Sequence, residues 1–484
     1  MSTEHFDFAI LGGGSAGYAA ARTAHELGLK TVVIDGAEEL SGLCILRGCM
    51  PSKALIESAN RNLVVQHAAE FGLSAKQGAA DARAIRDRKR KLIREFAEYR
   101  EGQLQDGRFT LMRGYGRFEK TDNAVLHLTV DMKDGGTQAI TAGYALIATG
   151  SVVNIPVLRG LNETGFWTSD TLLDAAEIPK SFVVLGGGAI ALEMAHYLHG
   201  IGREVTVLQR NTQLLTGLDA DLADVVQEAY TKRGINVICG TTLKEASGNP
   251  ENKRVHFQYT SEAARADAPT HLVDAAEILV ALGRRPAVEK LGLTAAGVAH
   301  ANNGLVEAHD TQQTTHPLIF AAGDVCGPLE VVHLAIQQGE VAAKNVAALR
   351  AGKEATHRMD YRCKLFGVFS HPQVASVGLS ECEAKVRGVP YRVASYPFND
   401  HGKSLIMGET DGFVKLLAHA ETGELLGGSV VGPEATELIH EIAVAMHFGA
   451  TAAALASAPH YHPTLSEIWT YPAEALMGPV SSFA

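Results

Sequence analysis

Residues 6–17, Phe6-Asp7-Phe8-Ala9-Ile10-Leu11-Gly12-Gly13-Gly14-Ser15-Ala16-Gly17, join a short apolar run to closely spaced glycines. The apolar run predicts a buried β-strand over 6–11, and the pattern after it predicts a helix that ends near residue 27. A second apolar run, at 31–34, predicts the next strand. This order of strand, glycine turn, helix and strand predicts a βαβ unit at the start of the chain.

The spacing of these glycines predicts that the unit binds a dinucleotide. Gly12 permits the tight turn, Gly14 lets a pyrophosphate approach the backbone, and Gly17 lets the helix pack closely on the strand. Asp35 directly follows the second strand, where its carboxylate can accept hydrogen bonds from ribose hydroxyls. Glycines alone would be a weak signal, but the strand, the helix and the acidic residue together favour nucleotide binding over a structural turn.

The same arrangement recurs later, with Gly186-x-Gly188-x-x-Ala191 between a predicted strand and a predicted helix. After the next strand, Gln209 takes the place of an acidic residue that would bind a ribose 2′-hydroxyl, and Arg210 follows. An arginine without that carboxylate favours a 2′-phosphate, and therefore NADPH over NADH. The alternative is that Arg210 only points into solvent. Two such units in one chain suggest electron transfer between two cofactors.

Cys44 and Cys49 lie close together, whereas the other four cysteines are isolated in the sequence. Pro51 suits the first turn of a helix, which predicts that Cys49 lies at a helix N-terminus. That position lowers the pKa of a thiol and favours the thiolate. Metal ligation is the alternative, but no second cysteine or histidine pair at zinc spacing accompanies the two residues. The pattern favours a redox-active pair and no metal site.

Near the C-terminus, His462 and Glu467 lie within the stretch His460-Tyr461-His462-Pro463-Thr464-Leu465-Ser466-Glu467. A disulfide reductase needs an acid that protonates the departing thiolate, and histidine titrates near neutral pH. Glu467 can orient the ring of His462 across the start of a helix and raise its pKa. A histidine with a purely structural role is the alternative.

Together these motifs resemble the class I FAD-dependent pyridine nucleotide–disulfide oxidoreductases, which include dihydrolipoamide dehydrogenase, glutathione reductase and mercuric reductase. The resemblance covers essentially the whole chain. It implies an α/β fold with two Rossmann-like dinucleotide-binding domains and a C-terminal α+β dimerisation domain. We expect the first part of the FAD-binding domain at 1–153 and the NAD(P)-binding domain at 154–283. The second part of the FAD-binding or central domain is expected at 284–355, and the interface (dimerisation) domain at 356–484.

The resemblance also implies which positions hold the cofactors. The residues expected to hold FAD are Gly12, Gly14, Gly17, Asp35, Lys53, Thr149, Gly150, Gly323 and Asp324. The residues expected to hold NADP(H) or NAD(H) are Gly186, Gly188, Glu193, Arg210 and Gly283.

The same resemblance implies the catalytic roles. Cys49 would face the flavin, and Cys44 would attack the substrate. Lys53 would pair with Glu193 beside the flavin ring. His462 and Glu467 would form an acid–base dyad that reaches the cysteines of a partner subunit, which implies a homodimer with a shared active site.

The substrate is the least determined expectation. The catalytic motifs look like those of dihydrolipoamide dehydrogenase. The residues near the C-terminus contain no cysteine pair, which argues against mercuric reductase. A small dithiol or disulfide, or a lipoyl protein, is therefore expected, with an NADPH-dependent reductase of glutathione-type or other low-molecular-weight disulfides as the alternative. An NAD(P)H oxidase or transhydrogenase and a redox-sensing or assembly subunit are the rivals from other classes.

The composition of the chain limits the kinds of partner that it is expected to bind. The net charge of −11 argues against nucleic acid, and the basic stretch at 83–94 is either a solvated helix face or a dock for an acidic partner. No apolar run is long enough to cross a membrane. No signal-peptide pattern precedes the first strand, so a cytoplasmic protein is expected.

Overall fold

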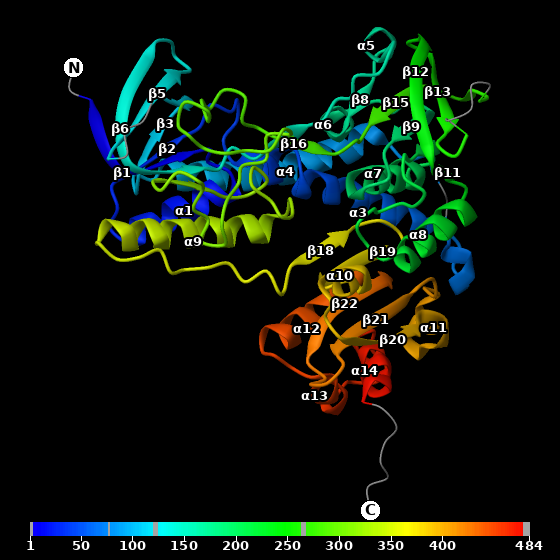
Figure 1. Ribbon diagram of the computed structural model, residues 1–484. Coiled ribbons are helices and arrows are strands. Elements are labelled where there is room, and N and C mark those ends of the chain that lie inside the picture. Colours follow the sequence, from blue (N-terminus) through cyan, green and yellow to red (C-terminus); the bar gives the residue numbers. More distant parts are fainter. Residues whose placement is uncertain (1–2, 76–77, 120–123, 263–267, 478–484) are drawn as a thin grey trace, which may run out of the picture. The chain divides into compact units, whose positions relative to one another are not determined.

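A computed structural model of the chain describes residues 3–75, 78–119, 124–262 and 268–477 (Figure 1). The chain divides into two compact units. The first comprises residues 1–54, 84–154 and 284–360, and the second comprises 55–83, 155–283 and 361–484.

The first unit is built on one large sheet and one separate pair of strands. Its elements are β1 (Glu4–Leu11), α1 (Ser15–Glu26), β2 (Thr31–Ile34), α2 (Gly42–Leu46), β3 (Thr110–Met112), β4 (Gly114–Phe118), β5 (Leu126–Met132), β6 (Thr137–Ile147), β7 (Ser151–Val153), β16 (Arg284–Pro286), β17 (Ile319–Ala321) and α9 (Val332–Arg350). Two further helices, α3 (Cys49–Gln66) and α4 (Ala82–Gln105), each contribute to both units.

The strand order in this sheet is β3-β2-β1-β6-β5-β4, and β17 also pairs with β6. Strands β1, β2, β3, β6 and β17 pair in parallel, as a βαβ topology requires. Phe8 and Ile10 of β1 belong to the core that also contains residues of α1 and α9. A Cβ on Gly339 of α9 would lie 2.2 Å from the carbonyl oxygen of Ala16, so glycine there lets the two helices pack closely.

The second unit contains three sheets, with strand orders β11-β10-β9-β15-β8, β12-β13-β14 and β18-β19-β22-β21-β20. Its strands are β8 (Trp167–Thr168), β9 (Ser181–Leu185), β10 (Glu204–Leu208), β11 (Asn236–Ile238), β12 (Thr241–Asn249), β13 (Asn252–Tyr259), β14 (His271–Ala275), β15 (Glu277–Val280), β18 (Leu365–Val368), β19 (Gln373–Gly378), β20 (Tyr391–Pro397), β21 (Phe413–His419) and β22 (Leu425–Gly432). The first sheet is parallel, and the last is antiparallel.

The helices of the second unit cover these sheets. They are η1 (Ala68–Phe71), α5 (Leu161–Thr164), α6 (Ser169–Asp174), α7 (Ala189–Gly200), α8 (Ala220–Lys232), α10 (Glu381–Arg387), η2 (Phe398–Asp400), α11 (Gly402–Met407), α12 (Ala435–His447), α13 (Ala452–Ser457), η3 (Ser466–Trp469) and α14 (Thr470–Leu476). Trp469 is fully buried in the C-terminal core, which contains residues of α12 and α14. In Figure 1 these helices lie beside the last sheet.

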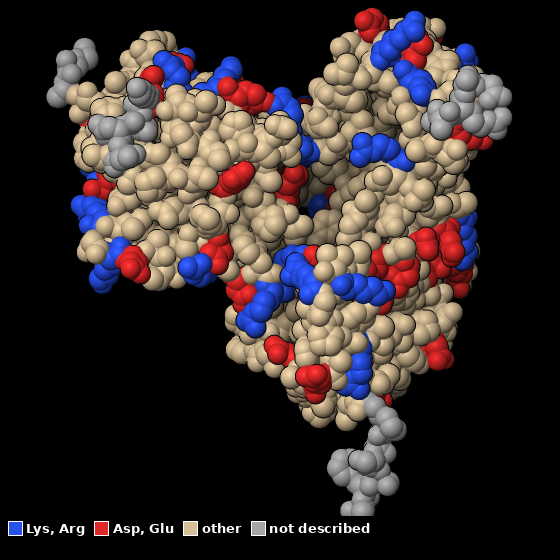
Figure 2. Space-filling model, in the orientation of Figure 1, with Lys and Arg blue, Asp and Glu red and all other residues tan. Residues whose placement is uncertain are grey.

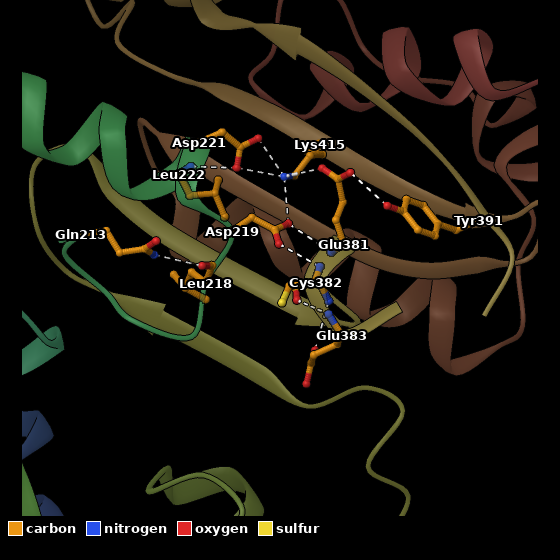
Figure 3. A network of polar contacts seen from close by, with 11 residues as sticks. Gln213, Leu218, Asp219, Asp221, Leu222, Glu381, Cys382, Glu383, Tyr391 and Lys415 are labelled. Atoms are coloured by element: carbon orange, nitrogen blue, oxygen red, sulfur yellow. Dashed lines mark hydrogen bonds and ion pairs between the residues drawn. The ribbon is translucent and has the colours of Figure 1, made fainter. Parts of the chain in front are cut away.

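A buried lysine joins residues 155–283 of the second unit to its C-terminal half, residues 361–484 (Figure 3). Lys415 of β21 lies 2.9 Å from Asp219, which precedes α8, and 2.8 Å from Asp221 within that helix. It also lies 3.1 Å from Glu381 at the start of α10. Asp219 in turn accepts hydrogen bonds of 3.2 Å from the backbone N–H groups of Glu381 and Cys382. This network ties α8 to α10 and β21.

The predicted strands at 31–34 and 6–11 are confirmed, although the latter begins earlier, at Glu4. Residues 466–469 form the 3₁₀ helix η3, and α14 begins at Thr470. Pro472 has no N–H group, and this start places it in the first turn of α14, where that group is not needed.

The basic stretch at 83–94 lies in α4. Lys89 is buried, and Arg88 donates a hydrogen bond of 3.2 Å to the carbonyl oxygen of Ala54. Figure 2 shows lysine and arginine side chains interspersed with acidic ones over the visible face. None of the helices in the described ranges is both long enough and apolar enough to span a membrane.

Candidate active site

The first glycine turn connects β1 to α1. Gly12 has a φ of +104°, and a Cβ on it would lie 2.4 Å from the carbonyl oxygen of Ala148. A Cβ on Gly17 would lie 1.8 Å from the carbonyl oxygen of Gly12, so only glycine allows α1 to approach the turn. Gly14 caps α1 without a side-chain hydrogen bond, which leaves N–H groups of the first helical turn available to an anionic ligand.

Polar groups beside this turn fit a dinucleotide. The Asp35 carboxylate is buried and accepts hydrogen bonds from the N–H groups of Gly13, at 2.8 Å, and Ala37, at 2.9 Å. The Thr149 hydroxyl is buried and has no hydrogen-bond partner within the described ranges. A buried polar atom without a partner costs free energy unless a ligand satisfies it. The glycine turn and this hydroxyl are therefore suited to bind FAD. Gly150, the residue after Thr149, has a φ of +68°.

A second polar cluster surrounds Asp324, which follows Gly323. Ser151 donates a hydrogen bond of 2.6 Å to Asp324, and Arg284 Nε donates one of 2.8 Å to the Ser151 hydroxyl. The Gly323 N–H donates a hydrogen bond of 2.7 Å to Gln338. The cluster orients the carboxylate that is expected to bind the ribityl chain. Sequence reasoning did not identify Ser151 or Arg284, because the pairing of β7 with β16 brings them together.

The cysteine pair lies against the first glycine turn. Gly42 begins α2 with a φ of +78°, and a Cβ on it would lie 2.6 Å from the Cα of Gly14. Glycine at this position therefore allows the segment that carries Cys44 to approach the place where a dinucleotide would bind. Cys49 is the first residue of α3, as Pro51 predicts.

The two thiols interact with each other. The hydrogen bond with Cys49 and burial raise the pKa of Cys44, while the charge of Lys53 acts in the opposite direction. Cys44, Cys49 and Lys53 are thus brought together in the first unit. Among the described residues, no group of three or more histidine, cysteine or acidic side chains could hold a metal ion.

The second glycine turn has the same geometry as the first. Gly186 has a φ of +119°, and a Cβ on it would lie 2.3 Å from the carbonyl oxygen of Ala281. Gly188 caps α7 without a side-chain hydrogen bond, so this helix also offers N–H groups to an anion. Gly283, with a φ of +85°, follows β15 at the end of the same sheet.

Beyond this turn, Gln209 and Arg210 point in different directions. Gln209 is buried and donates a hydrogen bond of 3.2 Å to the carbonyl oxygen of Gln213, whereas Arg210 is exposed. Glu193 of α7 is buried and accepts a hydrogen bond of 3.1 Å from the Phe369 N–H. Since Lys53 and Glu193 belong to different compact units, their pairing stays a prediction.

His462 and Glu467 form a close pair. His462 Nδ1 lies 2.9 Å from one carboxylate oxygen of Glu467 and 3.1 Å from the other. Because a carboxylate can only accept, Nδ1 carries the hydrogen and Nε2 is left for proton exchange. The His462 side chain is 78% exposed, whereas that of Glu467 is 11% exposed. A buried carboxylate thus orients an accessible imidazole.

Comparisons with known proteins agree with this geometry. Residues 6–339 match a family model described as pyridine nucleotide-disulphide oxidoreductase. Residues 366–473 match the dimerisation domain of pyridine nucleotide-disulphide oxidoreductases.

Similar proteins extend over almost the whole chain. A dihydrolipoyl dehydrogenase from Geobacillus stearothermophilus is 32% identical over 471 residues, which cover 97% of this chain and 96% of that protein. A dihydrolipoyl dehydrogenase from Mycobacterium tuberculosis is 33% identical over 480 residues, which cover 99% of this chain and 100% of that protein. The crystal structure of LpdA from Mycobacterium tuberculosis superimposes with a TM-score of 0.84 at 26% identity, covering 98% of this chain and 100% of that one.

Proposed function

Because the chain belongs to the pyridine nucleotide-disulphide oxidoreductase family, we propose that it exchanges electrons between a nicotinamide nucleotide and a dithiol–disulfide couple of the dihydrolipoyl type. The family and the fold class expected from the sequence are confirmed. The protein is an enzyme that uses FAD and NAD(H) or NADP(H). The observation that carries the proposal is the contact of the Cys44–Cys49 segment with the first glycine turn, through Gly42 and Gly14.

FAD would bind along the first glycine turn. When bound, it supplies two-electron transfer between the nicotinamide and the cysteine pair. Gly12, Gly14 and the N-terminus of α1 would hold the pyrophosphate, and Asp35 would accept hydrogen bonds from the ribose. The Thr149 hydroxyl would gain a hydrogen-bond partner in FAD. Asp324, whose carboxylate is oriented by Ser151, would hold the ribityl chain.

The cysteines would carry out the thiol–disulfide exchange. The Cys44 thiolate attacks one sulfur of the substrate disulfide, which forms a mixed disulfide and releases the other sulfur as a thiolate. His462, which has taken up the proton of the Cys44 thiol at Nε2, gives that proton to the released thiolate. The Cys49 thiolate then attacks the Cys44 sulfur, which leaves a Cys44–Cys49 disulfide and releases the second substrate sulfur as a thiolate that takes a proton from water. Two electrons have moved from the cysteine pair to the substrate, and each step can run in reverse.

A shared active site in a homodimer is part of the proposal. Residues 366–473 match the family's dimerisation domain, and these include His462 and Glu467. The wide exposure of the His462 ring leaves Nε2 accessible to a second copy of the chain. Each His462–Glu467 pair would then serve the cysteine pair of the other copy.

NADPH is proposed as the preferred nucleotide. The exposed Arg210 follows β10 directly after Gln209, where a 2′-phosphate would lie. The buried Gln209 side chain carries no charge that would repel this phosphate. The predicted role of Arg210 rests on this placement, and the roles of Glu193 and Gly283 in binding the nucleotide stay predictions.

The test is steady-state turnover of the purified, FAD-loaded protein in both directions. Lipoamide and dihydrolipoamide, and glutathione disulfide as the alternative substrate, are each assayed with NAD(H) and NADP(H). Fast dihydrolipoamide oxidation supports the proposed substrate class, whereas turnover of glutathione disulfide alone supports the alternative. The variants Cys44→Ser and His462→Gln are expected to lose roughly 10²-fold or more of the disulfide turnover. If Cys44→Ser retains the full rate of nicotinamide oxidation with the disulfide, the proposal is wrong, and an oxidase or transhydrogenase replaces it.

A further inference from the structure

A second histidine lies behind the His462–Glu467 pair. His401, between η2 and α11, is fully buried. Its Nδ1 lies 2.9 Å from the hydroxyl oxygen of Ser404, which is also fully buried. Its Nε2 lies 3.5 Å from a carboxylate oxygen of Glu467, and the backbone of Thr464 also contacts the ring. The Glu467 carboxylate is therefore placed between an accessible imidazole and a buried one.

The surroundings favour an uncharged His401. The rings of Phe398 and Tyr471 meet its ring edge to face, with centroids 6.5 Å and 6.4 Å away. Burial lowers the pKa of His401 and the charge of His462 adds to the lowering, whereas Glu467 and the Thr464 backbone act in the opposite direction. The neutral ring is consequently the stable form near neutral pH.

The hydrogen of a neutral His401 has one favoured location. The Ser404 O–H can donate to Nδ1, which makes Nδ1 the acceptor and leaves the hydrogen on Nε2. That hydrogen then faces Glu467. At 3.5 Å the contact is longer than an ordinary hydrogen bond, so it acts through electrostatic attraction. An uncharged donor attracts the carboxylate without neutralising it, and Glu467 keeps its full negative charge for His462.

We propose that His401 is a positioning residue of the reaction, which holds the Glu467 carboxylate against His462 and is itself oriented by Ser404. This inference rests on the proposed role of His462 as the acid in disulfide exchange. The series of contacts Ser404–His401–Glu467–His462 extends the acid–base pair into the C-terminal core. Its consequence is that the apparent pKa of the acid in turnover depends on a side chain that never reaches the substrate.

The first test compares His401→Leu, His401→Gln and Ser404→Ala in the FAD-loaded protein. The pH profile of kcat/KM for the disulfide is measured, together with the stopped-flow rate at which the nicotinamide nucleotide reduces the enzyme. Loss of the His401 donor is expected to move the limb of the pH profile that reports the acid to lower pH and to lower kcat/KM about tenfold. The rate of reduction by nicotinamide should stay within about twofold, because the acid takes no part in it. His401→Gln, whose amide N–H can occupy the place of Nε2–H, should recover most of kcat/KM.

The control is His316→Leu, which makes the same change at a buried histidine of the first unit. It is expected to lower stability without moving the pH profile. If His401→Leu does not fold, the pH profile of Ser404→Ala decides the question, since that change is small. Wild-type pH profiles of both His401→Leu and Ser404→Ala would overturn the inference and leave His401 as a core residue. Failure of the proposed function gives a different pattern, in which His462→Gln itself retains the disulfide turnover.

Discussion

Replacing Lys415 by methionine should destabilise the C-terminal half of the second unit. The Lys415 side chain is 3% exposed, and Asp219, the most buried of its three partners, is 9% exposed. Removing one partner of a buried ion pair costs about 3–5 kcal/mol, because the remaining charge stays uncompensated. Asp219 keeps two backbone N–H donors, while Asp221 and Glu381 are exposed enough for water to solvate them. The lower end of that range, about 3 kcal/mol, is therefore expected.

Tryptophan fluorescence provides the assay. The chain has two tryptophans, so a Trp167→Phe background leaves the buried Trp469 as a reporter of the C-terminal core. At a slope of about 2 kcal/mol per molar urea, a loss of about 3 kcal/mol shifts the unfolding midpoint by about 1.5 M at fixed protein and FAD concentrations. The control Lys232→Met removes a lysine that is 78% exposed and should change stability by less than about 0.5 kcal/mol. A midpoint for Lys415→Met no lower than that of Lys232→Met would refute the reasoning.

The pH dependence of this network follows from its shifted pKa values. Burial opposes the charge of Lys415, but the hydrogen bonds to Asp221 and Asp219 outweigh it and raise the pKa above 10.5. Burial likewise opposes the charge of Asp219, but the hydrogen bond and charge of Lys415, together with the backbone N–H groups of Glu381 and Cys382, outweigh it and lower the pKa below 3.8. The stabilisation from Lys415 is present below pH 10.5 and disappears as the pH rises through the raised pKa. The stabilisation from Asp219 is present above pH 3.8 and disappears as the pH falls through the lowered pKa. The wild-type advantage over Lys415→Met should therefore be constant between about pH 5 and 9.

Three further substitutions test the cofactor sites. Gly12→Ala would place a Cβ 2.4 Å from a carbonyl oxygen and should yield protein that no longer retains FAD on gel filtration. The control Gly102→Ala has open space around it in α4, and it should raise the free energy of unfolding in urea by about 0.5–1 kcal/mol. Arg210→Ala should raise KM for NADPH about tenfold and leave KM for NADH nearly unchanged, since it removes one charge-assisted hydrogen bond; equal effects on both nucleotides would contradict the proposed preference. Ser151→Ala should weaken FAD binding about tenfold in equilibrium titration, because Asp324 loses a donor that orients it, and unchanged affinity would show that the carboxylate needs no such support.

The local motifs could be predicted because their geometry depends on neighbouring residues. A strand, a glycine turn and a helix follow one another along the chain, so the positions of Gly12, Gly14 and Gly17 already imply a close helix–strand approach. The helix N-terminus at Cys49 follows in the same way from Pro51 two residues later. The βαβ units, the family and the pairing of His462 with Glu467 were all accessible at this level.

Long-range contacts could not be predicted, because the identity of a residue does not say which distant residue the fold brings beside it. Ser151 and Asp324 are 173 positions apart, and Lys415 and Asp219 are 196 positions apart. His401 shows the same limit, since its sequence neighbours give no sign of a buried contact with Glu467. Burial sets the energies of these contacts, because a charge or a polar group withdrawn from water needs a partner. That withdrawal follows from the packing of whole sheets and helices, and so only the tertiary structure reveals it.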